Sequence, residues 1–205
     1  SFLNERASKQ LFKAHAREHK IIHIGTHAES NNLSPELSRL VFAKNVSDSL
    51  DMDNNYLYTY EIYDQNLSSE LAILTACETG RPSYQPGEGM ISLAHAFNYA
   101  GSASVLTSLW QIDEKSSNEL LDGFYEHLLM GKPKNEALRL AKLDYLRSSE
   151  GRVLHPQYWA GLVLMGDVSP VELSAENNYL TWILAMMAGL FLIMVTAIVL
   201  KRKAP

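Results

Sequence analysis

Short apolar runs alternate with longer amphipathic stretches through most of this 205-residue chain. Residues 21–26 and 71–75 are mainly apolar runs that lead into small or turn-forming residues. Runs of this kind are typical of strands that are buried on both faces of a parallel sheet. Residues 103–109 and 162–165 show a similar pattern and predict two further strands.

The amphipathic stretches between these runs carry apolar residues at helical spacing, which predicts helices that cover the sheet. The predicted helices are residues 4–19, 88–100, 114–130 and 133–147. Alternation of strands with helices favours a mostly parallel central sheet that lies between two helical layers. We therefore expect an α/β fold built as a three-layer sandwich.

Residues 37–43 and 57–60 predict a small hairpin beside the main sheet. Four tyrosines lie in or next to it, namely Tyr56, Tyr58, Tyr60 and Tyr63. They can pack against the sheet edge, or they can form the wall of a substrate groove, because tyrosine offers a large contact area at low entropic cost. We give edge packing the greater weight.

The carboxyl end of the chain differs in character from the rest. Residues 179–200 carry no charge, and a helix of about 22 residues spans the roughly 30 Å hydrocarbon core of a bilayer. Tyr179 and Trp182 suit the membrane interface. This pattern predicts one transmembrane helix, since a helix of the protein core is rarely so long and so uniformly apolar.

The basic residues around this segment predict its orientation. Residues 201–203 are all lysine or arginine, whereas residues 171–178 contain neither. By the positive-inside rule the tail is cytoplasmic, and the preceding domain faces the periplasm or the extracellular space. That placement requires a signal peptide upstream. The alternative is a tail anchor with the domain inside the cell, which we weigh below the outward placement.

These patterns divide the chain into four parts. We expect an α/β domain at residues 1–168, a juxtamembrane linker at 169–178, the transmembrane helix at 179–200 and a basic tail at 201–205. The chain opens on an amphipathic stretch without an apolar signal core. We therefore expect it to be a piece of a longer protein.

Composition narrows the possible functions of the domain. The formal net charge is −5 and no basic patch is evident, so direct contact with nucleic acid is not expected. The single cysteine excludes an internal disulfide. Metal-binding spacings such as CxxC and HExxH are missing from the sequence. We expect neither a metal nor another cofactor.

His27 and Cys77 each follow one of the two predicted strands, at residues 21–26 and 71–75. If these strands are neighbours, the two side chains meet at the carboxyl edge of one sheet. An adjacent imidazole makes a thiol of ordinary pKa, about 8.5, a usable nucleophile. Alternatively, Cys77 is an inert buried residue, or a redox sensor, although no resolving cysteine is present. For His23, within the first strand, we expect a hydrogen-bonded core position.

Four segments, in this order, resemble the CHAT domain, a branch of the caspase-like cysteine peptidases of clan CD that also includes separase. They read HIGTHA, LTACETG, GEGMISLAHAFNYAGSASVLTSLWQID and HPQYWAGLVLMGD, and the resemblance covers about residues 5–167. It implies a caspase-like sandwich with His27 as general base and Cys77 as nucleophile. It also implies an oxyanion site formed by the backbone N–H groups of Ala28 and Cys77. The family usually has glycine in place of Ala28, so a methyl group is expected beside that site.

The resemblance further implies which residues line the pocket for the substrate residue before the cut bond. Our candidates are Glu78, Ser108, Trp110 and Asp113. Asp113 has a competing role as the N-cap of the helix that follows, with Ser116 in its first turn. We weigh the capping role above the pocket role.

Taken together, the resemblance and the apolar tail imply a membrane-anchored cysteine endopeptidase, a hydrolase that cleaves a partner protein. In this family tetratricopeptide repeats commonly precede the domain, and upstream repeats are expected to regulate it. The alternative function is a non-catalytic CHAT scaffold for protein signalling at the membrane.

Overall fold

A computed structural model of the chain describes residues 1–31, 33–44, 55–75, 77–78, 88–111, 113–172 and 187. The chain divides into two compact units, Ser1–Val171 and Glu172–Pro205. All helices and strands named below belong to the first unit.

The main sheet has four strands in the spatial order β1-β5-β7-β8. They are β1 (Ile21–Ile24), β5 (Leu71–Leu74), β7 (Ser104–Ser108) and β8 (Leu162–Gly166). The first three are parallel to one another, and β8 runs antiparallel to β7. The mixed α/β fold with a mostly parallel sheet, predicted from the apolar runs, is confirmed, and this arrangement fits a caspase-like fold.

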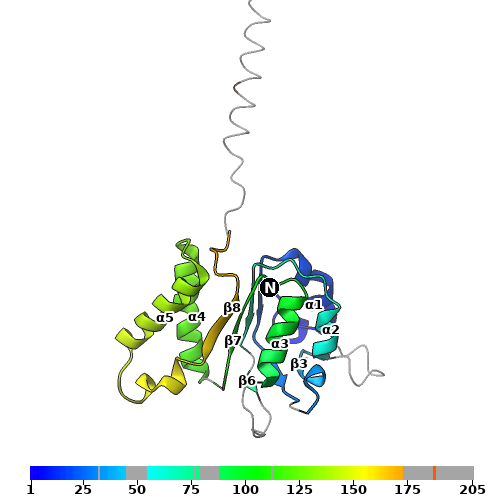
Figure 1. Cartoon of the computed structure of the whole chain (residues 1–205), viewed down its shortest axis with the longest axis horizontal. Coiled ribbons are helices and arrows are strands. Elements are labelled where there is room, and N and C mark those ends of the chain that lie inside the picture. The colour runs from blue at the N-terminus through cyan, green and yellow to red at the C-terminus, as the bar shows by residue number, and fades with distance from the viewer. Residues whose placement is uncertain are drawn as a thin grey trace, which may run out of the picture. The chain divides into compact units, whose positions relative to one another are not determined.

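Helices cover both faces of the main sheet. The elements α1 (Lys9–His15), α2 (Thr59–Tyr63) and α3 (Glu88–Tyr99) lie on one side, and α4 (Glu114–Leu129) and α5 (Lys134–Ser148) lie on the other (Figure 1). Side chains of β5 alternate between two cores: Ala72 and Leu74 pack with α3, whereas Leu71 and Ile73 pack with α4 and α5. All four are fully buried, which explains why β5 reads as a continuous apolar run.

The predicted helix over residues 4–19 is interrupted. The structure has a 3₁₀ turn at Asn4–Arg6, then α1, then a second 3₁₀ turn at Ala16–Glu18. Ser8 is extended and its hydroxyl accepts a hydrogen bond from the Leu11 N–H, so it caps a new helix. The backbone of Ala7 also accepts a hydrogen bond from Ala43. This contact with a distant segment draws residues 7–8 out of helical geometry. Three more 3₁₀ turns occur at Pro35–Leu37, Gly151–Leu154 and Pro156–Tyr158.

A second, smaller sheet has the strand order β4-β3-β2-β6. Its strands are β2 (His27–Glu29), β3 (Arg39–Val41), β4 (Tyr56–Tyr58) and β6 (Cys77–Glu78). The antiparallel pair β3 and β4 confirms the predicted hairpin. One face of this sheet is closed, because Ala28, Leu40 and Leu57 are completely buried in the core that contains α3.

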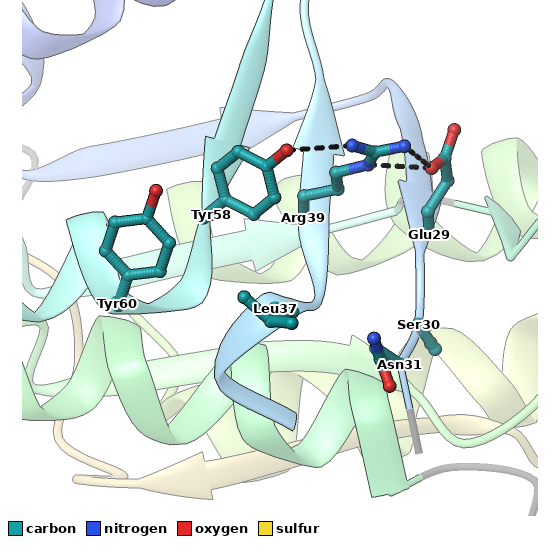
Figure 2. A pocket seen from close by; sticks show the side chains of 7 residues that line it. All are labelled: Glu29, Ser30, Asn31, Leu37, Arg39, Tyr58 and Tyr60. Carbon is teal, nitrogen blue, oxygen red and sulfur yellow. Dashed lines mark hydrogen bonds and ion pairs between the residues drawn. The ribbon is translucent and has the colours of Figure 1, made fainter. Parts of the chain in front are cut away.

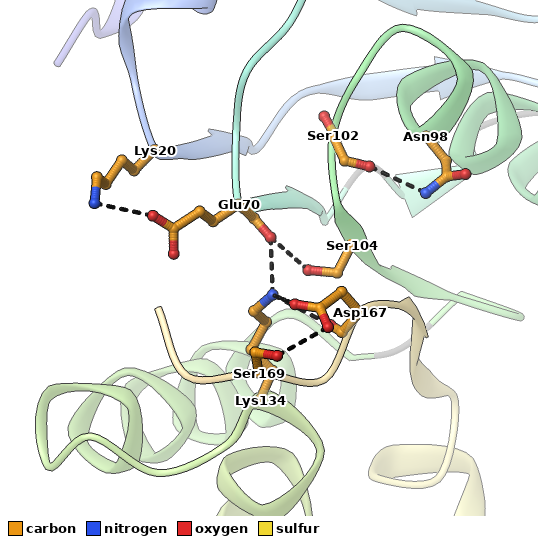
Figure 3. A network of polar contacts seen from close by, with 8 residues as sticks. All are labelled: Lys20, Glu70, Asn98, Ser102, Ser104, Lys134, Asp167 and Ser169. Atoms are coloured by element: carbon orange, nitrogen blue, oxygen red, sulfur yellow. Dashed lines mark hydrogen bonds and ion pairs between the residues drawn. The ribbon is translucent and has the colours of Figure 1, made fainter. Parts of the chain in front are cut away.

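A buried lysine joins three elements at the end of the main sheet opposite to β2 and β6 (Figure 3). Lys134, at the start of α5, is 1% exposed. Its Nζ donates to the carbonyl oxygen of Glu70 at 3.0 Å and to the carbonyl oxygen and Oδ2 of Asp167, both at 3.2 Å. Ser104 donates to the same Glu70 carbonyl at 2.7 Å. The ammonium group therefore ties α5 to the start of β5 and to the end of β8.

In the described part of the chain, no helix combines the length and hydrophobicity needed to cross a bilayer. Apart from Met187, the predicted transmembrane segment at 179–200 lies outside the described residues, as does the basic tail at 201–205. Both stay predictions.

Candidate active site

His27 and Cys77 are register partners in the parallel pair β2 and β6. Neighbouring strands lie roughly 4.8 Å apart, so the two backbone positions face each other at that spacing. The strands β2 and β6 follow β1 and β5 after two residues each. The register stays constant across both interruptions, since Ile24 pairs with Leu74 and His27 pairs with Cys77.

Hydrogen bonds fix the two short connections between the sheets, residues 25–26 and 75–76. The Thr75 N–H donates to the Ile24 carbonyl at 3.1 Å. The Thr26 hydroxyl donates to the carbonyl oxygen of Val41 on β3. Each connection is thus fixed to a neighbouring strand, and the backbone at His27 is held from both sides.

The side chain of His27 is exposed. Within the described ranges, none of the described side chains is its hydrogen-bond or ion-pair partner. In the same ranges, no three histidine, cysteine, aspartate or glutamate side chains lie close enough together to hold a metal ion.

Ala28 is completely buried and belongs to the same core as α3. Successive residues of a strand point to opposite faces, so its methyl group lies on the face away from His27. The methyl group expected beside the oxyanion site is therefore directed into the core. Alanine in place of the usual glycine does not obstruct the exposed face of the sheet.

The predicted pocket residues lie in different surroundings. Ser108 is the last residue of β7 and pairs with Leu162 of β8. Since β7 is parallel to β5, Ser108 lies at the sheet edge toward which β5 leads. Trp110 is held by a hydrogen bond from its Nε1 to the Gln157 carbonyl, at 2.9 Å.

Asp113 is the N-cap of α4, so the capping role that was expected for it is confirmed. Its Oδ1 accepts hydrogen bonds from the backbone N–H of Ser116 at 3.1 Å and from the Ser116 hydroxyl at 3.2 Å. The backbone of Glu78 pairs with Ala28, and the Glu78 side chain lies outside what the structure describes.

His23 links three elements behind this edge. Its Nε2 lies 3.1 Å from the Thr75 hydroxyl and its Nδ1 lies 2.9 Å from the Tyr125 hydroxyl on α4. The ring keeps an exposed edge, so the expected hydrogen bonding is confirmed but the core position is wrong. Loss of hydration between the two hydroxyl groups lowers the pKa of His23, and burial raises the pKa of Tyr125 to about 12. The imidazole is therefore neutral at pH 7.

A pocket that was not predicted from the sequence lies near His27, on the exposed face of the small sheet. Its volume is about 470 Å³, and it is lined by Glu29, Ser30, Asn31, Leu37, Arg39, Tyr58 and Tyr60 (Figure 2). The alternation of β2 could have indicated it, because Glu29 is two residues after His27 and shares its face.

Arg39 lines this pocket between Glu29 and Tyr58 (Figure 2). Its Nε and Nη2 contact Glu29 Oε2 at 2.7 and 2.6 Å, and its Nη1 donates to the Tyr58 hydroxyl at 2.9 Å (Figure 2). The guanidinium also lies 3.7 Å from the centre of the Tyr56 ring. Although partial burial acts in the opposite direction, the hydrogen bonds to Glu29 and Tyr58 raise the pKa of Arg39. Arg39 is thus a fixed cation.

The four tyrosines in and next to the hairpin differ in their surroundings. Tyr58 and Tyr60 line the pocket, with their rings stacked at 5.3 Å, which supports the groove-wall interpretation for these two. Tyr63 instead packs edge-on against Tyr99 of α3, at 5.2 Å.

Comparison with known proteins gives one family and two curated relatives. The family model for the CHAT domain matches residues 1–167. Tetratricopeptide repeat protein 28 of Homo sapiens is 30% identical to this chain over 135 residues, and the Mus musculus protein of the same name is 29% identical over 137 residues. Each match covers 66% of this chain but only 5% of the relative's length.

Proposed function

Because this chain belongs to the CHAT domain family, we propose that it is a cysteine endopeptidase that cuts a partner protein with His27 and Cys77. The observation that carries the proposal is the register pairing of these two positions. Fifty residues separate them in the sequence, yet the parallel strands β2 and β6 bring them face to face. An exposed imidazole without a partner in the described residues is available to act as a base.

In the proposed reaction His27 removes the proton from the Cys77 thiol. The thiolate attacks the carbonyl carbon of the scissile bond and forms a tetrahedral intermediate. The backbone N–H groups of Ala28 and Cys77 stabilise its oxyanion. His27 then gives the proton to the leaving amine as the C–N bond breaks. Water, deprotonated by His27, hydrolyses the thioester and restores the thiol.

Two substitutions test the dyad. Full-length Cys77→Ala and His27→Gln proteins are incubated with a cell extract, and new amino termini are identified by mass spectrometry. Cleavage should disappear in Cys77→Ala and fall at least 10²-fold in His27→Gln. His95→Gln, which changes an exposed histidine of α3, serves as the matched control and should cleave normally. Cleavage that survives in Cys77→Ala would refute the proposal.

The alternative function, a non-catalytic scaffold, uses the same fold without an activated thiol. Labelling with a thiol-directed electrophile separates the two functions, because thiolate reacts and thiol does not. For a peptidase, His27→Gln should slow the labelling of Cys77 at pH 7. An equal labelling rate in both proteins would favour the scaffold.

We further propose that the domain acts beside a membrane and beside repeat modules. The uncharged segment 179–200 and the basic tail 201–203 support a single membrane span with a cytoplasmic carboxyl end. The names of the two relatives support tetratricopeptide repeats upstream in the complete protein. An alkaline phosphatase fusion to the domain tests the orientation: an active fusion supports the outward placement, and an inactive one overturns it.

A further inference from the structure

The Arg39 pocket and the His27 position lie on one face of the small sheet. His27 pairs with Val41, and two residues along the strands Glu29 pairs with Arg39, which pairs with Tyr58. One strand spacing and one two-residue step together separate Arg39 from His27 by roughly 8 Å of backbone. An extended peptide covers that distance with two or three residues.

The strand order places the pocket on a definite side of the proposed reaction centre. In the order β4-β3-β2-β6, the strands β3 and β4 lie beyond His27 as seen from Cys77. A general acid must be close to the leaving amine to which it gives a proton. The part of a substrate that follows the cut bond therefore passes His27 and continues toward Arg39.

Donor groups dominate the inner wall of the pocket. Three of the five N–H groups of Arg39 are used, and the other two have no partner among the described residues. The Asn31 side-chain oxygen accepts from the N–H groups of Leu33 and Ser34, which leaves its NH₂ turned toward the pocket (Figure 2). The Ser30 hydroxyl is buried without a hydrogen-bond partner.

Among the described residues that line the pocket, one carboxylate, that of Glu29, opposes these donors. Both contacts from Arg39 reach the same oxygen of Glu29, Oε2, so its other oxygen stays available. A buried hydroxyl without a partner, an unused amide NH₂ and two free N–H groups on a cation together match a carboxylate, which accepts several hydrogen bonds at once. Leu37 and the ring of Tyr60 complete the pocket with apolar surface.

We propose that this pocket binds the carboxylate of an aspartate or glutamate located two or three residues after the cut bond. This inference rests on the proposed peptidase function and adds a substrate class to it. Arg39 supplies the charge, and Asn31 and Ser30 add hydrogen bonds. Glu29 fixes the guanidinium and at the same time weakens the attraction, because it is a like charge beside the incoming carboxylate.

Cleavage preference is the first measurement. A peptide library made by digesting a proteome is incubated with the full chain, and residues after each new cut are counted. We expect acidic residues to be enriched at the second or third position, and Arg39→Gln to reduce the enrichment about tenfold, the effect of one charged hydrogen bond. Glu29→Gln should increase it. Arg139→Gln, which removes an exposed arginine of α5, is the matched control and should not change it.

Binding without cleavage is the second measurement. Cys77→Ala protein is titrated with two fluorescein-labelled peptides, free at the amino terminus, that differ only by aspartate or asparagine at the second residue. The aspartate peptide should bind about tenfold more tightly, and Arg39→Gln should remove the difference. A third peptide with lysine at that residue tests the opposite charge. Preferential binding of this peptide would overturn the inference, because it would mean that Glu29, and not Arg39, selects the charge of the ligand.

The two measurements separate the inference from the function on which it rests. Cleavage without an acidic preference, or with a preference that Arg39→Gln leaves intact, overturns the pocket but not the peptidase. Aspartate-dependent binding that requires Arg39, in a protein that cuts nothing, supports the pocket and overturns the peptidase. Absence of both overturns both. Since Glu29→Gln and Arg39→Gln should act in opposite directions, a simple loss of folding cannot imitate the expected pair of results.

Discussion

The hydroxyl of Tyr125 lies 2.9 Å from Nδ1 of His23 and joins helix α4 to strand β1. Burial keeps this phenol protonated, with its pKa raised to about 12, and also lowers the pKa of the imidazole. Both groups are therefore neutral at pH 7, and one hydrogen bond joins them. This contact lies on the strand that leads to His27.

Removing the hydroxyl should weaken the attachment of α4. Tyr125→Phe leaves the ring in place but removes one hydrogen bond, so the free energy of unfolding should fall by about 1 kcal/mol. Urea unfolding followed by tryptophan fluorescence measures the change. Tyr99→Phe alters a tyrosine that is 77% exposed and should leave the midpoint where it is. Equal midpoints for all three proteins would contradict a stabilising role of the hydroxyl.

His23 should make stability depend on pH in one direction. Its pKa in the folded protein lies below the unfolded value of about 6.5. Between those two values the unfolded chain binds more protons, so stability rises with pH and is fully present above about pH 6.5. The gain is lost as the pH falls toward the folded pKa. Unfolding midpoints measured from pH 5 to 8 should therefore show a slope that His23→Gln reduces. His95→Gln should keep it.

Lys134 should be important for stability but not for cleavage. Lys134→Met fills a similar volume but leaves the carbonyl groups of Glu70 and Asp167 without this donor. Loss of a hydrogen bond from a charged donor costs about 1.5–3 kcal/mol, and we expect a loss of that size in the free energy of unfolding. Lys115→Met, at a lysine with an 86% exposed side chain, is the control. A change below about 0.5 kcal/mol would contradict the role given to the buried ammonium group.

Substitutions at Asp113 distinguish its two proposed roles. Asp113→Ala removes the cap of α4 and should cost about 1 kcal/mol, whereas Asp113→Asn keeps the cap and removes the charge. If capping is its only role, Asp113→Asn should match the parent protein in both stability and cleavage preference. Thermal unfolding measures the stability, and the peptide library measures the cleavage preference. A changed preference in Asp113→Asn, at unchanged stability, would assign the carboxylate to the substrate pocket instead.

Much of the fold could be predicted because its signals are local. The strand β5 is buried on both faces and therefore reads as an unbroken apolar run, and the hairpin of β3 and β4 alternates clearly. The interruption at Ser8 could not be predicted in the same way, because it depends on a contact with Ala43, which is distant in the sequence. Leu129 is 74% exposed although Leu128 beside it is 1% exposed, because the buried stripe of α4 follows Leu121, Phe124 and Leu128.

In the candidate site, too, local signals could be predicted from the sequence and contacts between distant residues could not. His27 and Cys77 could be named from the sequence because each follows a recognisable strand. The Arg39 pocket could not, since it depends on the register between β2 and β3 and on the side-chain directions that follow from that register. The tyrosines of the hairpin indicated the region but not the cation between Glu29 and Tyr58. Pairing between strands was the missing information.

The two connections that lead from the large sheet to the small one contain equal numbers of residues, 25–26 and 75–76. Because the two connections are equally long, β2 and β6 begin side by side, and these dipeptides act as a matched pair of spacers. One extra residue at 25–26 would invert the side chains of β2, turning the imidazole inward and the alanine methyl outward, and one at 75–76 would shift β6 out of register with β2. Sequence drift at this junction is therefore expected to preserve its length more strictly than its chemistry.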